Sequence, residues 1–407
     1  MKKNPSWPVV TGPLESYAAG YRDELLVRLC YSRWAASAHM YLFAHVSSWL
    51  SERGLEAAKL GAAQVREFLA DRRAEGHVTR LTPRGLIPLL GYLRRLGVVA
   101  HELAPEPEDP VSRLVGEFGD YLTTERGLSP RTIIGYQRVA TLFLLSCAPV
   151  PTEAGCGVER LGVERINAFL LSRCARVSVG SANNVVTALR ALLRFFYLRG
   201  CTAVSLADCV PAGAAWRDSG RSRGLGPGDV GRLLASCDRR TAVGRRDFAI
   251  LTVLSRLGLR ANEVASLSLD DLDWRAGELT VAGKGGRRDR LPLPVDVGQA
   301  LAAYCRRGRP RNDHRALFLH ARAPFAPLSP GAITHVVRQA SRRAGLPPVG
   351  AHRLRHSSAS AMRRAGAPMF EIGQVLRHRW VTTTALYAKD DLDALASIAR
   401  PWPGARP

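Results

Sequence analysis

The chain has 407 residues, 46% of them hydrophobic, and its 58 Lys and Arg against 35 Asp and Glu give a formal net charge of +23 at pH 7. The hydrophobic fraction excludes a disordered chain, and the length predicts two or three domains. So large a positive excess favours a polyanionic partner through counterion release and steering, which makes nucleic acid the first class of partner to consider.

The sequence shows no signal for a membrane or for export, and its cysteines are not paired by spacing. No apolar run is long enough to span a bilayer, and the charged stretch from Met1 to Pro5 has no apolar stretch after it, so we expect neither a membrane span nor an export signal. The eight cysteines are scattered without a C-x-x-C pair, which is typical of thiols in a reducing compartment and not of a zinc site. We therefore expect a cytoplasmic, nucleoid-associated protein.

Residues 111–205 have the pattern of an all-helical domain. Ser129-Pro130 has the form of an N-cap followed by proline at the first helical position, and apolar residues then recur with the helical period. Two more helices are expected at Val163–Cys174 and Ser181–Arg199. A proline-rich acidic stretch from His101 to Pro110 precedes this domain and suits a linker.

The first segment, residues 1–105, repeats part of this pattern. Phe68-Leu69 parallels Phe169-Leu170, and Leu89 through Gly97 parallels Leu192 through Gly200. Because short apolar matches also arise by chance between helices, a duplicated module and two unrelated modules both stay open. Either way we expect a small helical bundle with a DNA-binding or accessory role.

Residues 229–407 follow a turn-rich linker at 206–228 and have a mixed pattern. Leu279–Val281 and Arg290–Leu293 are expected to form two strands around a glycine-rich turn. Helices are expected at Asp229–Cys237, Arg246–Arg256 and Asn262–Leu267, from Ser329-Pro330 to about Ala344, and from Ala351 onward. The predicted fold class is mainly α: N-terminal helical bundles, then a mixed α/β domain with a small antiparallel β-ribbon.

Two pairs of residues in the last segment have helical spacing. Arg260 and Glu263 lie one turn apart, so the carboxylate can hold the guanidinium in place, although a surface ion pair is the simpler reading of this pair alone. His352 and Arg355 share a helical face and would present a proton-transfer group beside a phosphate-binding fork; a basic helix on a DNA-binding surface is the alternative. A zinc site at His352 and His356 is disfavoured, because the glutamate of the H-E-x-x-H motif is missing.

Lys284 and Tyr387 indicate a function only when they are considered together with these arginines and histidines. Lys284 lies between glycines in the predicted hairpin turn, where it would donate a proton to a leaving oxygen or simply contact the DNA backbone. Tyr387 follows His378 by nine residues. A lone tyrosine is usually a packing residue, but it can form a covalent phosphoester where arginines and histidines stabilise the developing charge.

In order and spacing, these stretches resemble the tyrosine recombinase, or phage-integrase, family. The matching stretches are Arg246–Leu251 leading to Gly258–Glu263, then Gly283–Gly285, His352–His356, and Leu376–His378 through Tyr387. Residues from Leu128 to Gly200 are similar to the helical core-binding domain of that family, whereas residues 1–105 go beyond its minimal two-domain pattern.

The resemblance implies a role for each matching residue. Tyr387 would attack the scissile phosphate, forming a 3′-phosphotyrosyl link and freeing a 5′-hydroxyl. Arg260 and Arg355 would neutralise the nonbridging oxygens, Lys284 would protonate the leaving oxygen, His352 would assist proton transfer, His378 would bond the phosphate, and Glu263 would support Arg260. No metal or other cofactor is implied, because the covalent link conserves the energy of the phosphodiester.

Two positions depart from the family pattern. Arg377 stands where glycine is usual, which costs ~1 kcal/mol or more if φ is positive there and otherwise adds a phosphate contact. Ser357-Ser358 replaces the commoner threonine-aromatic pair. Neither departure removes a catalytic group, so we expect an active enzyme. The candidates for DNA contact are the basic residues near these motifs: Arg131, Arg287, Arg288, Arg290, Arg353 and Arg377.

The leading hypothesis is a site-specific DNA recombinase or integrase, or the transposase of a mobile element. It would act on double-stranded DNA as a homotetrameric synapse, with accessory proteins or sister recombinases as further candidate partners. A relaxing enzyme similar to type IB topoisomerases and a catalytically silent DNA-binding protein are the alternatives.

Overall fold

The computed structural model describes residues 6–100, 109–147, 158, 161–211, 225–283 and 287–377. One compact unit spans Ala100–Ser219, and the residues before and after it make up the other. Buried apolar side chains gather in three large clusters, one each in the N-terminal, middle and C-terminal parts of the chain. No helix in the described ranges is both long and apolar enough to cross a membrane.

The N-terminal part is a helical bundle. Its α-helices are α1 (Ala18–Asp23), α2 (Arg33–Glu52), α3 (Ala62–Ala74) and α4 (Ile87–Arg95), joined by short helical turns at Glu15–Tyr17, Glu24–Arg28, Ala57–Lys59 and Pro83–Leu86. Ser32 caps α2, because its side chain accepts a hydrogen bond from the N–H of Ala35 at 3.3 Å. Apolar side chains of α2, α3 and α4 then share one core.

The middle unit packs four helices around its own core. They are α5 (Pro110–Thr124), α6 (Pro130–Cys147), α7 (Val163–Cys174) and α8 (Val179–Leu198). Asp109 caps α5 by accepting from the N–H of Ser112 at 2.8 Å, so the helix begins inside the stretch that we expected to be a linker. At the other end, Leu206, Ala207 and Val210 are buried in the same core beside a short turn at Ala207–Cys209. Residues 206–211 therefore pack with this unit, because burying their apolar side chains stabilises it.

The helices α4 and α8 end alike. Gly97 and Gly200 both have left-handed backbones, with φ of +72° and +70°. The N–H of Gly97 donates to the carbonyl of Arg94, and the N–H of Gly200 donates to that of Tyr197, each at 3.0 Å. These are positions that the predicted repeat aligns. Glycine caps of this kind end roughly a third to a half of helices, so the duplicated module stays a prediction.

The C-terminal part is built around α10 (Ala242–Arg256), whose residues Ala249 to Leu254 are all buried. This helix packs against α9 (Pro227–Ala235), α12 (Val295–Arg307), α13 (Pro330–Arg343) and α14 (Ala351–Arg364). The other helices described in this part of the chain are α11 (Ala261–Ser266) and α15 (Met369–Val375), with a short turn at Leu269–Asp271. Because α10 is central, the turn at its C-terminal end is held in place from several sides.

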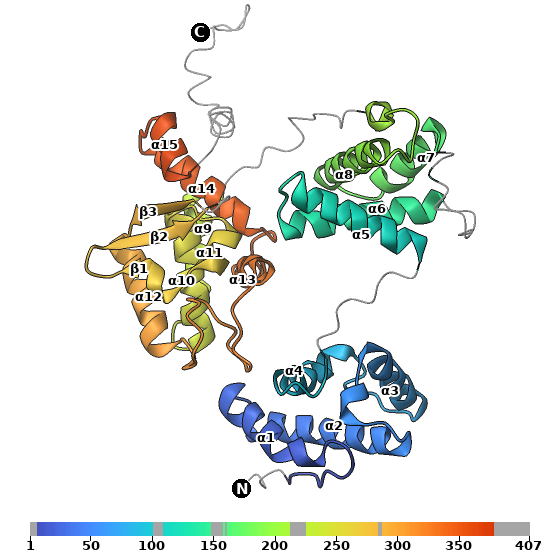
Figure 1. Ribbon diagram of the computed structural model, residues 1–407. Helices are drawn as coiled ribbons and strands as arrows, with labels where there is room; N and C mark the ends of the chain where they lie inside the picture. The colour runs from blue at the N-terminus through green and yellow to red at the C-terminus, as the bar shows by residue number, and fades with distance from the viewer. Residues whose placement is uncertain are drawn as a thin grey trace, which may run out of the picture. The chain divides into compact units, whose positions relative to one another are not determined.

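A small antiparallel sheet lies beside these helices (Figure 1). Its strands are β1 (Leu272–Asp273), β2 (Glu278–Ala282) and β3 (Arg288–Pro292), in the order β1-β2-β3. Ala282 pairs with Arg288, and the N–H of Gly283 donates to the carbonyl of Arg287 at 2.7 Å, which closes the predicted hairpin. Lys284, which follows Gly283 in the sequence, lies outside the described residues.

The structure confirms a mainly helical fold with a small antiparallel sheet, and in the C-terminal part it adds the strand β1 and the helix α12, which the pattern did not predict. β1 contributes only two residues, too few for a recognisable alternation of side chains. α12 begins after Pro294, which offers no side-chain cap, and its buried stripe includes the small residue Ala300. Both elements depend on packing against β2 and α10, respectively.

Candidate active site

The turn after α10 requires a glycine for two separate reasons. Gly258 has a left-handed backbone with φ of +59°, a conformation that favours glycine. A Cβ at this position would lie only 2.5 Å from Cδ2 of Leu376. The chain therefore makes a close turn there and places Arg260 directly before α11.

Arg260 and Glu263 form a two-point contact at the start of α11. The backbone N–H of Arg260 donates to Oε2 of Glu263 at 2.8 Å, and its Nη1 donates to Oε1 at 2.7 Å. The Arg260 side chain is 42% exposed, whereas that of Glu263 is 5% exposed. The pair is therefore anchored on a buried carboxylate and presents its cation outward, unlike an ion pair that lies wholly on the surface.

The Glu263 carboxylate is ionised in spite of its burial. Burial, the largest influence, raises its pKa. The N–H of Arg260, the charge of Arg377 and the side chain of Arg260 together outweigh that effect and hold the pKa below its usual range. A buried carboxylate in this state needs cationic partners, and two arginines supply them.

Arg355, on α14, lies in the interior, with only 1% of its surface exposed. Its Nη1 donates to the carbonyl of Gly258 at 2.6 Å, and its Nη2 donates to the carbonyl of Leu376. One guanidinium thus ties together the turn after α10 and the end of α15, the two segments that carry Arg260 and Arg377. The predicted face shared with His352 is present, because both residues belong to α14.

His352 remains exposed, and its ring packs edge-on against that of His356, with centroids 4.5 Å apart. Partial loss of hydration lowers the pKa of His352, and the charges of Arg355 and Arg260 lower it further. The imidazole is therefore neutral at pH 7, the form that can accept a proton.

The predicted DNA-contact residues lie in different surroundings. Arg287, Arg288 and Arg290 are exposed beside or on β3; Arg288 and Arg290 have only long ion pairs, each 3.6 Å, to Asp271 and Glu278. Such pairs are weak, so these side chains are available to a partner. Arg131 is exposed near the start of α6, in the other unit, and Arg353 is half-buried on α14.

Arg377 does not lie at the surface, where we expected a DNA contact. Its side chain is 8% exposed, and its Nη2 donates to Oε2 of Glu263 at 2.7 Å. The positive φ that we considered for this position is present, at +54°. Sequence reasoning missed the contact with Glu263, because nothing in the spacing of the two residues indicates that they meet.

A second contact that we did not foresee involves Ser357. Its hydroxyl oxygen accepts a hydrogen bond from the N–H of Leu225 at 2.7 Å, which fastens the first described residue of this part of the chain to α14. The only signal in the sequence is the departure from the threonine-aromatic pair of the family. His378 and Tyr387, like Lys284, lie outside the described residues.

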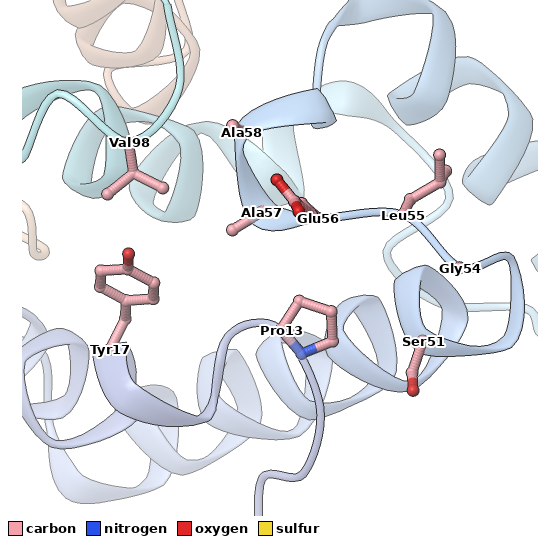
Figure 2. Close-up of a pocket in the computed structure, with 9 residues that line it drawn as sticks. All are labelled: Pro13, Tyr17, Ser51, Gly54, Leu55, Glu56, Ala57, Ala58 and Val98. Carbon is pink, nitrogen blue, oxygen red and sulfur yellow. The ribbon is translucent and has the colours of Figure 1, made fainter.

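One hollow in the described residues lies apart from this site. A hollow of 680 Å³ in the N-terminal part lies between Pro13, Tyr17 and Ser51 on one side and residues 54–58 with Val98 on the other (Figure 2). None of the candidate residues lines it. Within the described ranges, no group of three or more His, Cys, Asp or Glu side chains could hold a metal ion.

Comparison with known proteins decides the family. A model of the phage integrase family matches residues 225–393, and a model of the phage integrase N-terminal SAM-like domain matches residues 115–200. A putative integrase/recombinase of Sinorhizobium fredii, y4rA, is 38% identical over 97% of this chain and 95% of its own length. The chain belongs to the phage integrase family of tyrosine recombinases.

Further relatives of this integrase-family chain agree with that assignment. Tyrosine recombinase XerD of Mycobacterium tuberculosis is 31% identical and covers 71% of this chain and 95% of its own length. In fold, the chain resembles XerH solved on its difH substrate, with a TM-score of 0.57, 18% identity and coverage of 72% of this chain and 98% of that one. It also resembles a lambda integrase tetramer on a Holliday junction, with a TM-score of 0.54, 16% identity and coverage of 81% and 90%.

Proposed function

We propose that this protein is a site-specific recombinase that cleaves and rejoins double-stranded DNA, with Tyr387 as its nucleophile. The observation that carries the proposal is the half-exposed guanidinium of Arg260, anchored on buried Glu263 in a phage-integrase chain. A preorganised cation is what phosphoryl transfer needs, because its catalysis rests on positioning and on charge around the transferred group.

Each step of the proposed reaction is assigned to particular residues. The hydroxyl oxygen of Tyr387 forms a bond to phosphorus while the bond from phosphorus to the 5′-oxygen breaks. The leaving oxygen takes a proton, which we assign to Lys284, and the tyrosine proton passes to neutral His352. Arg260 and His378 stabilise the nonbridging oxygens, and Arg355 joins them when its guanidinium exchanges the carbonyls of Gly258 and Leu376 for the phosphate. Attack by a 5′-hydroxyl on the phosphotyrosine reverses the step.

We propose a division of labour along the chain. Residues 1–105 form an accessory or DNA-binding bundle, 111–205 the core-binding domain and 229–407 the catalytic domain. Of the linker expected at 206–228, residues 206–211 pack with the core-binding domain. Arg131, Arg287, Arg288, Arg290 and Arg353 contact DNA. Four copies hold two duplexes in the cell interior, where accessory proteins or sister recombinases take part; lambda integrase, a fold relative, was solved as a tetramer on a Holliday junction.

Trapping the covalent intermediate tests the proposal. The substrates are overlapping duplexes that together cover the DNA on either side of this gene, each with a nick in one strand. Cleavage beside the nick releases a short fragment that carries the 5′-hydroxyl. Without that hydroxyl the strand cannot be rejoined, so the protein stays attached to the DNA. We expect an adduct with wild type and none with Tyr387→Phe. No adduct on any duplex that binds tightly would overturn the enzymatic function, and an adduct with Tyr387→Phe would overturn the nucleophile.

A relaxation assay separates this function from that of a topoisomerase. Site-specific strand exchange requires the native sequence and synapsis, so a supercoiled plasmid without that sequence stays supercoiled. Relaxation of such a plasmid at the rate of adduct formation would instead indicate a relaxing enzyme.

A further inference from the structure

Arg377 adopts a backbone conformation that its side chain does not favour. It follows the C-cap residue Leu376 of α15 with φ of +54°, and its N–H donates to the carbonyl of Gln374 at 2.9 Å. A non-glycine residue in this region carries a steric penalty of ~1 kcal/mol or more, since its Cβ crowds a carbonyl. The guanidinium, which glycine lacks, is the group of this residue that can offset the penalty.

The guanidinium of Arg377 is buried against two carboxylates. Its Nη2 lies 2.7 Å from Oε2 of Glu263, and its Nε lies 3.9 Å from Oδ2 of Asp289 on β3. The longer contact is an ion pair without a hydrogen bond, and Nε has no hydrogen-bond partner. The hydrogen bond to Glu263 is therefore the short, directional contact of this side chain.

Glu263 consequently has two arginines that differ in exposure. Arg260 binds Oε1 and is 42% exposed, whereas Arg377 binds Oε2 and is 8% exposed. With Arg260 alone the pair would be neutral, and an approaching phosphate would compete with the carboxylate for the guanidinium. With Arg377 added, the three groups carry one net positive charge, and the cation that faces solvent is Arg260.

We propose that Arg377 is a positioning residue that neutralises Glu263 and leaves the charge of Arg260 available to the scissile phosphate. This inference rests on the proposed function, in which Arg260 binds that phosphate. It differs from a direct DNA contact by Arg377, because the side chain reaches the phosphate only through Glu263 and Arg260.

Three substitutions separate charge from backbone. Arg377→Gln removes the charge, Arg377→Lys retains it, and Arg377→Gly removes the charge while relieving the positive φ. We expect Arg377→Gln to slow single-turnover adduct formation about tenfold or more, a loss of roughly 1.4 kcal/mol, and Arg377→Lys to recover part of the rate. Arg377→Gly should be as slow as Arg377→Gln without unfolding earlier; a rate at or above that of wild type would overturn the inference.

DNA affinity distinguishes an indirect role from a direct one. If Arg377 touched phosphate, Arg377→Gln would reduce the slope of log affinity against log salt by about one unit. We expect that slope to stay unchanged on the duplexes used for trapping. The inference would be contradicted if Arg377→Gln had a flatter slope of log affinity against log salt and formed the adduct at the wild-type rate at saturating protein. Arg377 would then be a DNA-contact residue. Arg315→Gln is the matched control, because Arg315 forms an exposed ion pair with Asp270 away from Glu263 and should leave the rate unchanged.

A double-substitution cycle tests whether Glu263 transmits the effect. In Glu263→Gln there is no carboxylate to neutralise, so adding Arg377→Gln should change the adduct rate by less than about threefold. If the rate losses of the two single variants instead multiply in the double variant, the inference is wrong. The same cycle measured by denaturant unfolding without DNA should show coupling between the two residues, and additive effects there would overturn the pairing. If wild type forms no adduct, the proposed function fails, but the unfolding cycle still decides the pairing.

Discussion

Gly258 and Leu376 are in contact although the turn after α10 and the end of α15 are far apart in sequence. A Cβ on Gly258 would lie 2.5 Å from Cδ2 of Leu376, and both carbonyls accept hydrogen bonds from Arg355. The segments that carry Arg260 and Arg377 therefore meet at one buried guanidinium. Any change that separates them should disturb the site before it disturbs the rest of the fold.

Gly258→Ala should be strongly destabilising and should abolish adduct formation. It combines the strain of a positive φ, about 1 kcal/mol, with a clash that forces a shift in packing and costs roughly 1–3 kcal/mol more. Thermal and denaturant unfolding measure the loss. Gly277→Ala is the matched control, because Gly277 has φ of +66° but no atom within 4 Å of its Cβ position. Equal losses in the two variants would mean that the contact with Leu376 contributes nothing.

Ser357→Ala should cost about 1–3 kcal/mol, because it leaves the buried N–H of Leu225 without an acceptor. Ser341→Ala is its counterpart. Both hydroxyls donate to the carbonyl four residues earlier at 2.9 Å, and the Ser357 hydroxyl in addition accepts from the distant N–H of Leu225. Denaturant unfolding should show the larger loss for Ser357→Ala. Similar losses would indicate that the bond to Leu225 is replaced by water.

The rate of adduct formation should fall at acidic pH, because protonated His352 can no longer accept a proton. The pKa of His352 lies below its ordinary value of about 6.5, so the imidazole stays neutral at pH 7 and gains its proton only as the pH falls through the lowered pKa. We expect a plateau above about pH 6.5 and a decline below it. His352→Gln should lower the plateau and remove this decline, whereas replacing exposed His314 by Gln should preserve both. An unchanged decline in His352→Gln would assign it to another group.

His39 should make the stability of the N-terminal bundle depend on pH. Burial, followed by the charge of Arg80, lowers the pKa of His39 to about 4, and its Nδ1 has no hydrogen-bond partner. A folded-state pKa below the unfolded value near 6.5 means that the unfolded chain binds the extra proton, so stability falls as the pH drops from about 6.5 towards 4. Hydrogen exchange of the α2 amides measures this slope. A slope that His39→Gln leaves unchanged would exclude His39 as its source.

Local pattern predicted much of the fold. The helix at Val163–Cys174 has the predicted bounds, and the strands around Gly283 and the helix after Ser329 lie where they were expected. These elements depend on periodicity, capping and turn residues, which act over a few positions. β1, α12 and the packing of Leu206 to Val210 were not predicted, because each depends on a partner surface that local pattern does not contain.

The candidate site divides in the same way. By itself, the sequence determined which residue types could handle a phosphate and which of them share a helical turn, because a helix places residues three apart on one face. Only the tertiary structure decided that Arg355 joins Gly258 to Leu376 and that Arg377 reaches Glu263, 114 positions away. The physical reason is that a buried carboxylate needs cationic partners: spacing along the chain supplies Arg260 to Glu263, whereas only packing brings Arg377 to it.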